Sequence, residues 1–126
     1  MRWISKRALL LLHDESLAEH GGASGIRDEG LLESALMRPE NMLAYEDQRD
    51  LATLAAAYAY GLAKNHPFID GNKRAAFLGA GLFLALNGHR LVAAQADATL
   101  QVLALAASEI AETAFADWLR AHLSPI

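Results

Sequence analysis

The sequence contains no cysteine and only three prolines in 126 residues. The absence of cysteine excludes disulfide bridges and thiolate metal sites, and it is compatible with a reducing compartment. Long apolar runs are also missing: residues 51–63 and 75–86 fall short of the ~20 residues that a helix needs to span a bilayer. The apolar run near the N-terminus ends at residue 13 without a cleavage pattern, so we interpret it as a helix and not as a signal peptide. We therefore expect a soluble, cytoplasmic protein with no membrane contact.

The chain also lacks a strong excess of charge of either sign. It has 11 basic and 15 acidic residues, which gives a formal net charge of −4, and neither sign forms a long run. Proteins that coat nucleic acid normally carry a basic face, so direct binding of nucleic acid is not expected. A small local site for an anion is still compatible with this balance.

Apolar residues are abundant by contrast, at 53% of the chain against 21% charged residues. This composition argues against disorder, and 126 residues are enough for one continuous core. No repeat, linker or low-complexity tract divides the sequence. Helix signals recur along it while strand signals are scarce. We predict one domain over residues 1–126 with an all-α fold, a compact helical bundle.

Capping residues divide the chain into six predicted helices. Polar side chains that can accept a hydrogen bond from a free amide mark the first three starts, at Ser5, Asp28 and Asp50. The first helix is expected to stop at the glycines 21–22, and the second at Pro39. The fourth helix should open at Gly71 and close near residue 88. Asp97 is expected to start the fifth helix, from 99 to about 107, and the sixth should cover about 112–123. A short extended segment is expected at residues 89–92.

The predicted helices over 51–63 and 75–86 are apolar nearly all the way round. A helix without a polar face is normally enclosed by other helices. We expect these two, antiparallel or nearly so, at the centre of the bundle. Six aromatic residues are predicted to pack in the core or at its edge, namely Tyr58, Tyr60, Phe77, Phe83, Phe115 and Trp118.

The connection between the two central helices is polar, and residues 66–74 read HPFIDGNKR. Its last amides open a helix, where they have no carbonyl partner and attract an anion together with the helix dipole. Gly71 allows a ligand to approach the backbone, and Asn72 follows it at the helix start. Lys73 and Arg74 add positive charge at an end where cations are otherwise unfavourable, which predicts a bound phosphate.

Two titratable side chains lie next to this predicted anion site. A histidine ordinarily titrates near pH 6.5, so His66 can accept a proton from an incoming hydroxyl. Asp70 is predicted to hold Mg²⁺ beside the phosphates, although it could instead cap the following helix. Phe68 is expected to enter the core and fix the loop. Lys64 could reach the phosphates or could serve as a cation at the end of its own helix. The set is typical of phosphoryl or nucleotidyl transfer.

The remaining chemistry-bearing residues form no further pattern. His13, His20, His89 and His122 have no spacing typical of zinc sites, and we expect them at the surface. The sequence has no P-loop, no Gly-x-Ser-x-Gly motif and no nucleophilic cysteine, which argues against P-loop NTPases and acyl transfer.

The pattern His66-x-Phe68-x-Asp70-Gly71-Asn72-x-Arg74 resembles the signature of the Fic/Doc family. The resemblance extends over most of the chain, to GIRD at 25–28, RP at 38–39, YE at 45–46 and FLxxNG at 83–88. The size is similar to that of the minimal death-on-curing branch. This resemblance implies an all-helical toxin of a type II toxin–antitoxin system, together with a separate, Phd-like antitoxin as partner.

The resemblance also implies roles for the residues of the motif. His66 would be the catalytic histidine, Asp70 the acidic residue, and the residues that contact phosphate would be Gly71, Asn72 and Arg74. Lys73 and Phe77 stand where the larger Fic enzymes usually have glycine and a second arginine. Both departures resemble the death-on-curing branch, which implies transfer of the γ-phosphate of ATP to a Ser/Thr hydroxyl of a translation factor, such as elongation factor Tu.

Two alternatives stay open. The first is transfer of AMP to a protein hydroxyl with the same base, and the second is a non-catalytic module that binds its antitoxin and adjusts repression of their operon. Ser108-x-x-x-Glu112 resembles the self-inhibitory motif of some family members, but Thr113 follows where glycine or asparagine is usual. Inhibition by a separate antitoxin is therefore the expectation.

Overall fold

The computed structural model describes all 126 residues and is built mainly from six α-helices. In chain order the elements are α1 (Lys6–His20), α2 (Glu29–Glu46), α3 (Leu51–Asn65), α4 (Asn72–Leu86), β1 (His89–Leu91), α5 (Gln95–Ala106), α6 (Glu112–Ala121) and β2 (Leu123–Pro125). The strands β1 and β2 pair antiparallel, with Arg90 opposite Ser124. The predicted all-α fold is confirmed, with one small two-stranded sheet added, and β1 lies within the predicted extended segment.

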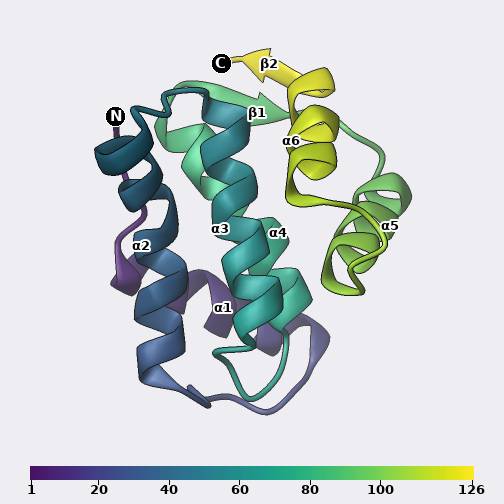
Figure 1. The fold of residues 1–126 in the computed structure, drawn as a ribbon. Helices are drawn as coiled ribbons and strands as arrows, with labels where there is room; N and C mark the ends of the chain where they lie inside the picture. The colour runs from purple at the N-terminus through teal and green to yellow at the C-terminus, as the bar shows by residue number, and fades with distance from the viewer.

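Helices α3 and α4 lie at the centre of the molecule (Figure 1). Helix α2 packs on one side of α3 and α6 on the other, while α1 packs against α4. The loop between α3 and α4 lies at the end of the bundle opposite the chain termini (Figure 1). No helix combines the length and the apolar character needed to cross a bilayer.

Burial follows the pattern expected for a central pair of helices. Ten of the 15 residues of α3 are buried, and so are seven residues of α4. The rings of Tyr58, Phe83 and Phe115 are fully buried, whereas those of Tyr60, Phe77 and Trp118 are partly buried. The predicted packing role of these six aromatic residues is therefore confirmed.

The first three helices start at the predicted caps. The side chain of each cap accepts a hydrogen bond from the amide three residues ahead, at Ser5, Asp28 and Asp50. Two other boundaries were predicted wrongly. Helix α2 continues through Pro39 to Glu46, because the proline ring is fully buried and its packing offsets the hydrogen bond that it removes. Helix α5 begins at Gln95, ahead of Asp97, whose carboxylate instead accepts a hydrogen bond from the Trp118 indole at 2.9 Å.

His13 is buried in the structure, and its predicted surface position is wrong. Its side chain is only 2% exposed, and its ring stacks on Phe68 with centroids 3.8 Å apart. The Nε2 atom has no hydrogen-bond partner. Burial lowers the pKa of His13, and this effect is partly opposed by the nearby carboxylates of Asp14 and Asp70. The histidine belongs to the inward face of α1 that also carries Leu9 and Ser16.

The other three histidines differ among themselves. His20 is exposed, as predicted, whereas His89 and His122 are half-buried. Their Nδ1 atoms lie near the carbonyl oxygens of Asn87 and Trp118, at 3.1 and 2.7 Å. Hydrogen bonds to local backbone therefore hold these two rings against the protein.

Helices α2 and α3 approach closely at Gly61, and this contact generates a prediction. A Cβ atom at position 61 would lie 3.0 Å from the backbone Cα of Ala35, which cannot move independently of α2. The substitution Gly61→Ala should lower the free energy of unfolding by about 1–3 kcal/mol through overpacking. Gly81→Ala in α4, where nothing lies within 4 Å of the added Cβ, should instead stabilise the helix by about 1 kcal/mol. Urea denaturation of both variants tests this, and a Gly61→Ala protein as stable as wild type would contradict it.

The burial of His13 generates a second prediction, on pH dependence. Since its folded pKa is lowered, the neutral ring supports folding above the unfolded pKa of about 6.5, and this support is lost as pH falls below it. One such group changes the free energy of unfolding by at most about 1.4 kcal/mol per pH unit. The loss between pH 7.5 and 5.5 should therefore be smaller in His13→Gln than in wild type. His20→Gln, on the same helix but exposed, is the control, and equal losses in His13→Gln and wild type would contradict the prediction.

Candidate active site

The loop between α3 and α4 begins and ends with residues in the left-handed conformation. His66, the C-cap of α3, has φ 50° and ψ 53°, and Gly71, the N-cap of α4, has φ 77° and ψ 21°. Glycine adopts this conformation freely, but a residue with a side chain is disfavoured there by about 1–2 kcal/mol. Strain of this kind persists only where neighbouring contacts impose it, and it is concentrated at functional sites.

The side chain of Asn72 holds the loop together. It is 5% exposed, its Oδ1 accepts a hydrogen bond from the Phe68 amide at 2.9 Å, and its Nδ2 donates to the Phe68 carbonyl at 2.9 Å. These two bonds fix which end of the amide is oxygen and which is nitrogen. The predicted contact of Asn72 with phosphate can therefore come from its backbone amide, since its side chain is occupied within the loop.

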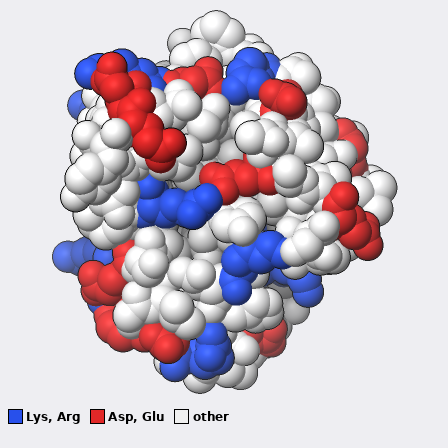
Figure 2. Space-filling model, viewed as in Figure 1, with Lys and Arg blue, Asp and Glu red and all other residues white.

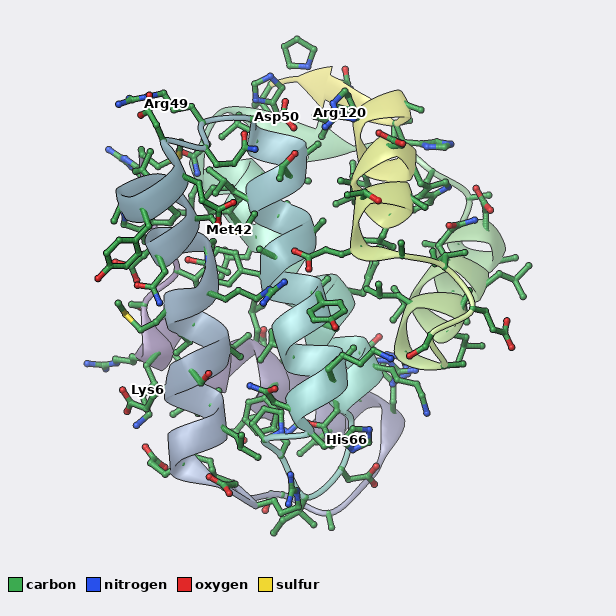
Figure 3. All side chains as sticks on the ribbon, viewed as in Figure 1. Lys6, Met42, Arg49, Asp50, His66 and Arg120 are labelled. Carbon is green, nitrogen blue, oxygen red and sulfur yellow. The ribbon has the colours of Figure 1, made fainter.

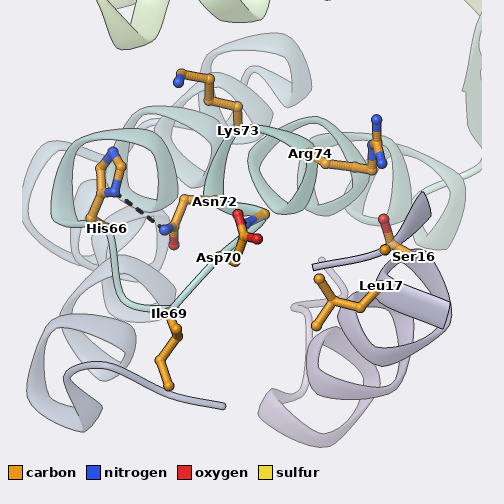
Figure 4. A pocket seen from close by; sticks show the side chains of 10 residues that line it. Ser16, Leu17, His66, Ile69, Asp70, Asn72, Lys73 and Arg74 are labelled. Carbon is orange, nitrogen blue, oxygen red and sulfur yellow. Dashed lines mark hydrogen bonds between the residues drawn. The ribbon is translucent and has the colours of Figure 1, made fainter. Parts of the chain in front are cut away.

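The second hydrogen of the Asn72 amide faces His66. The distance from Asn72 Nδ2 to His66 Nδ1 is 3.2 Å, and the two side chains meet in Figure 4. An amide nitrogen can only donate, so this contact requires that Nδ1 carries no proton. The neutral ring in this state carries its proton on Nε2. When His66 takes up a second proton, no lone pair is left and the contact with Asn72 must end.

Phe68 enters the core, as predicted, and packs against α1. Its ring is 1% exposed and lies on the ring of His13. A Cβ atom at position 71 would lie 3.0 Å from His13 Cε1, so Gly71 is required both by its conformation and by this close approach. The loop thus rests directly on a buried histidine.

A cavity of about 350 Å³ lies between the start of α4 and the end of α1 (Figure 4). Its lining joins the loop to the end of α1, and consists of His66, Ile69, Asp70, Gly71, Asn72, Lys73 and Arg74 with Ser16, Leu17 and Gly21. No side chain caps the first turn of α4. Lys73 and Arg74 are exposed and form no ion pair with any carboxylate. Free amides and unpaired cations at a helix N-terminus favour the binding of an anion such as phosphate.

Asp70 lies at the edge of this cavity and is exposed. Its Oδ1 accepts a hydrogen bond from the Gly71 amide at 2.8 Å, and its Oδ2 lies 3.4 Å from the amide of Ala23. The N-cap of α4 is Gly71, so Asp70 does not cap the first turn. No group of three side chains in the protein could hold a metal ion alone. A single carboxylate fits Mg²⁺ only where phosphate oxygens and water supply the other ligands, as Mg²⁺ commonly requires.

The structure does not bring Lys64 to the cavity. Its ammonium group donates to the carbonyl of Ala106 at 3.1 Å and to the hydroxyl of Ser108, at the connection between α5 and α6. The predicted phosphate contact of Lys64 is therefore corrected: the residue ties α3 to α5. Glu112 of the Ser108-x-x-x-Glu112 pattern pairs with Arg38, and it does not line the cavity.

Sequence reasoning missed two residues that contact the loop, His13 and Arg27. The guanidinium of Arg27 donates from Nε to the His66 carbonyl at 2.6 Å and from Nη2 to the Asn65 carbonyl at 2.8 Å. Residues 25–28 run beside residues 67–69, with an isolated bridge between Ile26 and Phe68. The resemblance included Arg27 but gave it no role, and nothing in the local sequence signals either contact.

Comparison with known proteins identifies the family of this chain. A sequence model described as the Fic/DOC family matches residues 3–84, which include the whole loop. The chain is 39% identical over 120 residues to "Protein kinase doc" of Escherichia phage P1, covering 95% of this chain and 94% of that protein. It is also 42% identical over 74 residues to "Toxin Doc" of Mycolicibacterium smegmatis (strain ATCC 700084 / mc(2)155), covering 58% of this chain and 57% of that protein. On this evidence the chain belongs to the Fic/DOC family.

Proposed function

We propose that this protein is a toxin that transfers the γ-phosphate of ATP to a Ser/Thr hydroxyl of a translation factor, with elongation factor Tu as the model target, until a cognate antitoxin neutralises it. The names of the two relatives support a toxin and a kinase activity. The observation that carries the proposal is the pair of free cations, Lys73 and Arg74, at the uncapped start of α4 beside His66.

In this reaction His66 acts as the base. The only lone pair of the neutral ring is on Nδ1, so Nδ1 must leave Asn72 to take the proton of the target hydroxyl. The hydroxyl oxygen then forms a bond to the γ-phosphorus, and the bond from that phosphorus to the β-phosphate oxygen breaks. The products are a phosphorylated protein and ADP, and the imidazolium returns its proton to solvent. The contact between His66 Nδ1 and Asn72 is given up in the step, because imidazolium cannot accept a hydrogen bond.

Positive charge beside the loop would stabilise the transferring group. The amides that open α4, together with Lys73 and Arg74, face the cavity where negative charge accumulates in the transition state. Mg²⁺, when bound with ATP, supplies further charge neutralisation, and Asp70 is the side chain that would hold it. The chain's own contribution is thus a base and a preorganised set of donors.

A second cavity, of about 310 Å³, suggests where the nucleoside lies. It is formed between α4 and α5 by Phe77, Ala98, Val102 and Leu103, with Gln95 and Thr99 as polar groups, and it shares Lys73 and Arg74 with the loop cavity. Apolar surfaces with a few polar groups suit a purine nucleoside. Adenosine bound there would direct its phosphate chain past the two cations, with the terminal phosphate nearest His66. This direction favours γ-phosphate transfer over AMP transfer.

Control by a separate antitoxin fits the same structure. Glu112, the glutamate of the pattern that resembles the self-inhibitory motif, is paired with Arg38 and does not line the cavity beside His66. This position of Glu112 favours a separate antitoxin as the source of the blocking group.

The central prediction concerns which phosphate is transferred. Purified protein should label one lysate protein with γ-labelled ATP and Mg²⁺, and should give no label with α-labelled ATP. His66→Ala should abolish the label, whereas His20→Ala, which removes an exposed histidine outside the site, should retain it. Mass spectrometry of the labelled protein would identify the target and the modified hydroxyl.

Three results would contradict this proposal. Label from α-labelled ATP would mean AMP transfer, and our reading of Lys73, Phe77 and the second cavity would be wrong. Label that persists in His66→Ala would exclude this base. Growth arrest that survives His66→Ala in cells would indicate toxicity through binding alone.

The proposed nucleoside site generates its own prediction. Thr99 is exposed and lines the second cavity, so Thr99→Trp should fill it without disturbing the core, and should raise the KM for ATP about tenfold, a loss of about 1.4 kcal/mol in binding. Ala96→Trp places the same ring on an exposed position of α5 outside the cavity and should leave KM unchanged. Steady-state kinetics of the two variants and of wild type test this prediction. Equal KM values for ATP in Thr99→Trp and wild type would mean that the nucleoside does not bind in this cavity.

A further inference from the structure

Arg27 contacts the active-site loop although it lies nearly 40 residues earlier in the chain. Its Nε donates to the carbonyl of His66 at 2.6 Å, and its Nη2 donates to the carbonyl of Asn65 at 2.8 Å. We propose that Arg27 is a positioning residue that holds the imidazole of His66 in its place beside Asn72 at the edge of the cavity, an inference that rests on the function proposed above for His66. It would do so through the backbone, without touching ATP or the target.

The two carbonyls that Arg27 binds belong to the end of α3. The last carbonyls of a helix have no partner within the helix and carry its negative dipole end. The planar guanidinium presents two parallel donors on a positive charge, so it satisfies two adjacent carbonyls at once. Lysine would supply the charge, but its ammonium has a single nitrogen and cannot present two nitrogen donors side by side in one plane. The geometry therefore favours arginine.

Arg27 acts where the backbone is strained. His66 has a φ of 50°, a conformation that glycine usually adopts after a helix, and it carries a side chain there. The direction of the imidazole depends on this conformation, because it sets the Cα–Cβ bond. The hydrogen bond from Arg27 Nε to the His66 carbonyl fixes the peptide plane that follows the histidine. Without this bond the residue can relax toward ordinary helical or extended angles, and the ring would turn with it.

The arginine is itself held in place by the loop. The backbone amides of Arg27 and Asp28 both donate to the carbonyl of Pro67, at 2.7 and 3.1 Å, and the Ile69 amide donates to the carbonyl of Gly25 at 3.1 Å. Asp28 in turn caps α2. The backbone at Arg27 is thus anchored between the start of α2 and the loop, which places the guanidinium beside the end of α3.

Two simpler roles for Arg27 do not fit. It forms no ion pair with any carboxylate, so it is not part of a surface charge network. It does not line the cavity at the start of α4, in contrast to Lys73 and Arg74, so it is not a further phosphate ligand. The partners of its guanidinium are the backbone carbonyls of Asn65 and His66.

The test compares Arg27→Met, which keeps the length of the side chain but removes both donors, with Arg27→Lys, which keeps the charge. Arg49→Met is the matched control, because Arg49 is an exposed arginine at the far end of the molecule from His66 (Figure 3). We expect kcat for phosphate transfer to fall between tenfold and a hundredfold in Arg27→Met, since a small misplacement of a catalytic group costs about this much. The KM for ATP should change less than about threefold, because no phosphate contact is lost. Arg27→Lys should lie between Arg27→Met and wild type, and Arg49→Met should match wild type.

A second measurement does not depend on activity. The ring nitrogens of His66, observed by long-range ¹H–¹⁵N correlation spectra of the intact protein, report whether Nδ1 still accepts from Asn72. Their signals should shift in Arg27→Met and remain unchanged in Arg49→Met. Melting temperatures of all variants show that they are folded.

The two measurements separate this inference from the function on which it rests. If the wild-type protein transfers no phosphate, the kinase proposal fails, and the His66 signals alone still test the positioning. Unchanged signals in Arg27→Met would then overturn it. Unchanged kcat of Arg27→Met in an active protein would also overturn it, because the substitution would then have no effect on the base. A change confined to a higher KM for ATP would overturn it as well, because it would mean that Arg27 contacts the nucleotide directly.

Discussion

The side-chain amide of Asn72 exchanges two hydrogen bonds with the backbone of Phe68, and the loop between α3 and α4 depends on this pairing. A buried amide left without partners costs about 1–3 kcal/mol, so the group can be buried only where the chain turns back to meet it. The same turn sends the Phe68 ring into the core and leaves the first amides of α4 facing the cavity. The nitrogen that completes the pairing also faces His66. Base and anion site are therefore set by one side chain.

Support for this loop comes from parts of the chain that are distant in sequence. The ring of His13, from α1, carries Phe68 and closes the space behind Gly71. The segment before α2 runs along the other side of the loop, where Arg27 binds the end of α3. The site is thus assembled from three segments, each fixed by its own helix. A strained residue such as His66 can persist there, because its surroundings leave it no alternative.

The charge of the site differs from the charge of the whole chain. The formal net charge is −4, and positive and negative side chains are interspersed on the face shown in Figure 2. At the start of α4, however, Lys73 and Arg74 form no ion pair with any carboxylate, and the helix dipole adds to their field. Over the Debye length of about 8 Å at physiological salt, such a local excess decides what binds. The net charge by itself argued only against a protein whose main task is to coat nucleic acid.

The sequence by itself determined the helices, the central position of the two apolar ones and the residues of the loop, because caps and apolar periodicity act over a few residues, as at Ser5, Asp28 and Asp50. The roles of the loop residues came from a motif and remain proposals. Only the tertiary structure decided that Pro39 lies inside a helix, that His13 is buried and that Lys64 turns toward α5. The same is true of the contact of Arg27 with α3. In each case the outcome depends on a partner many residues away, and neither propensity nor local pattern contains the packing that brings the partner close.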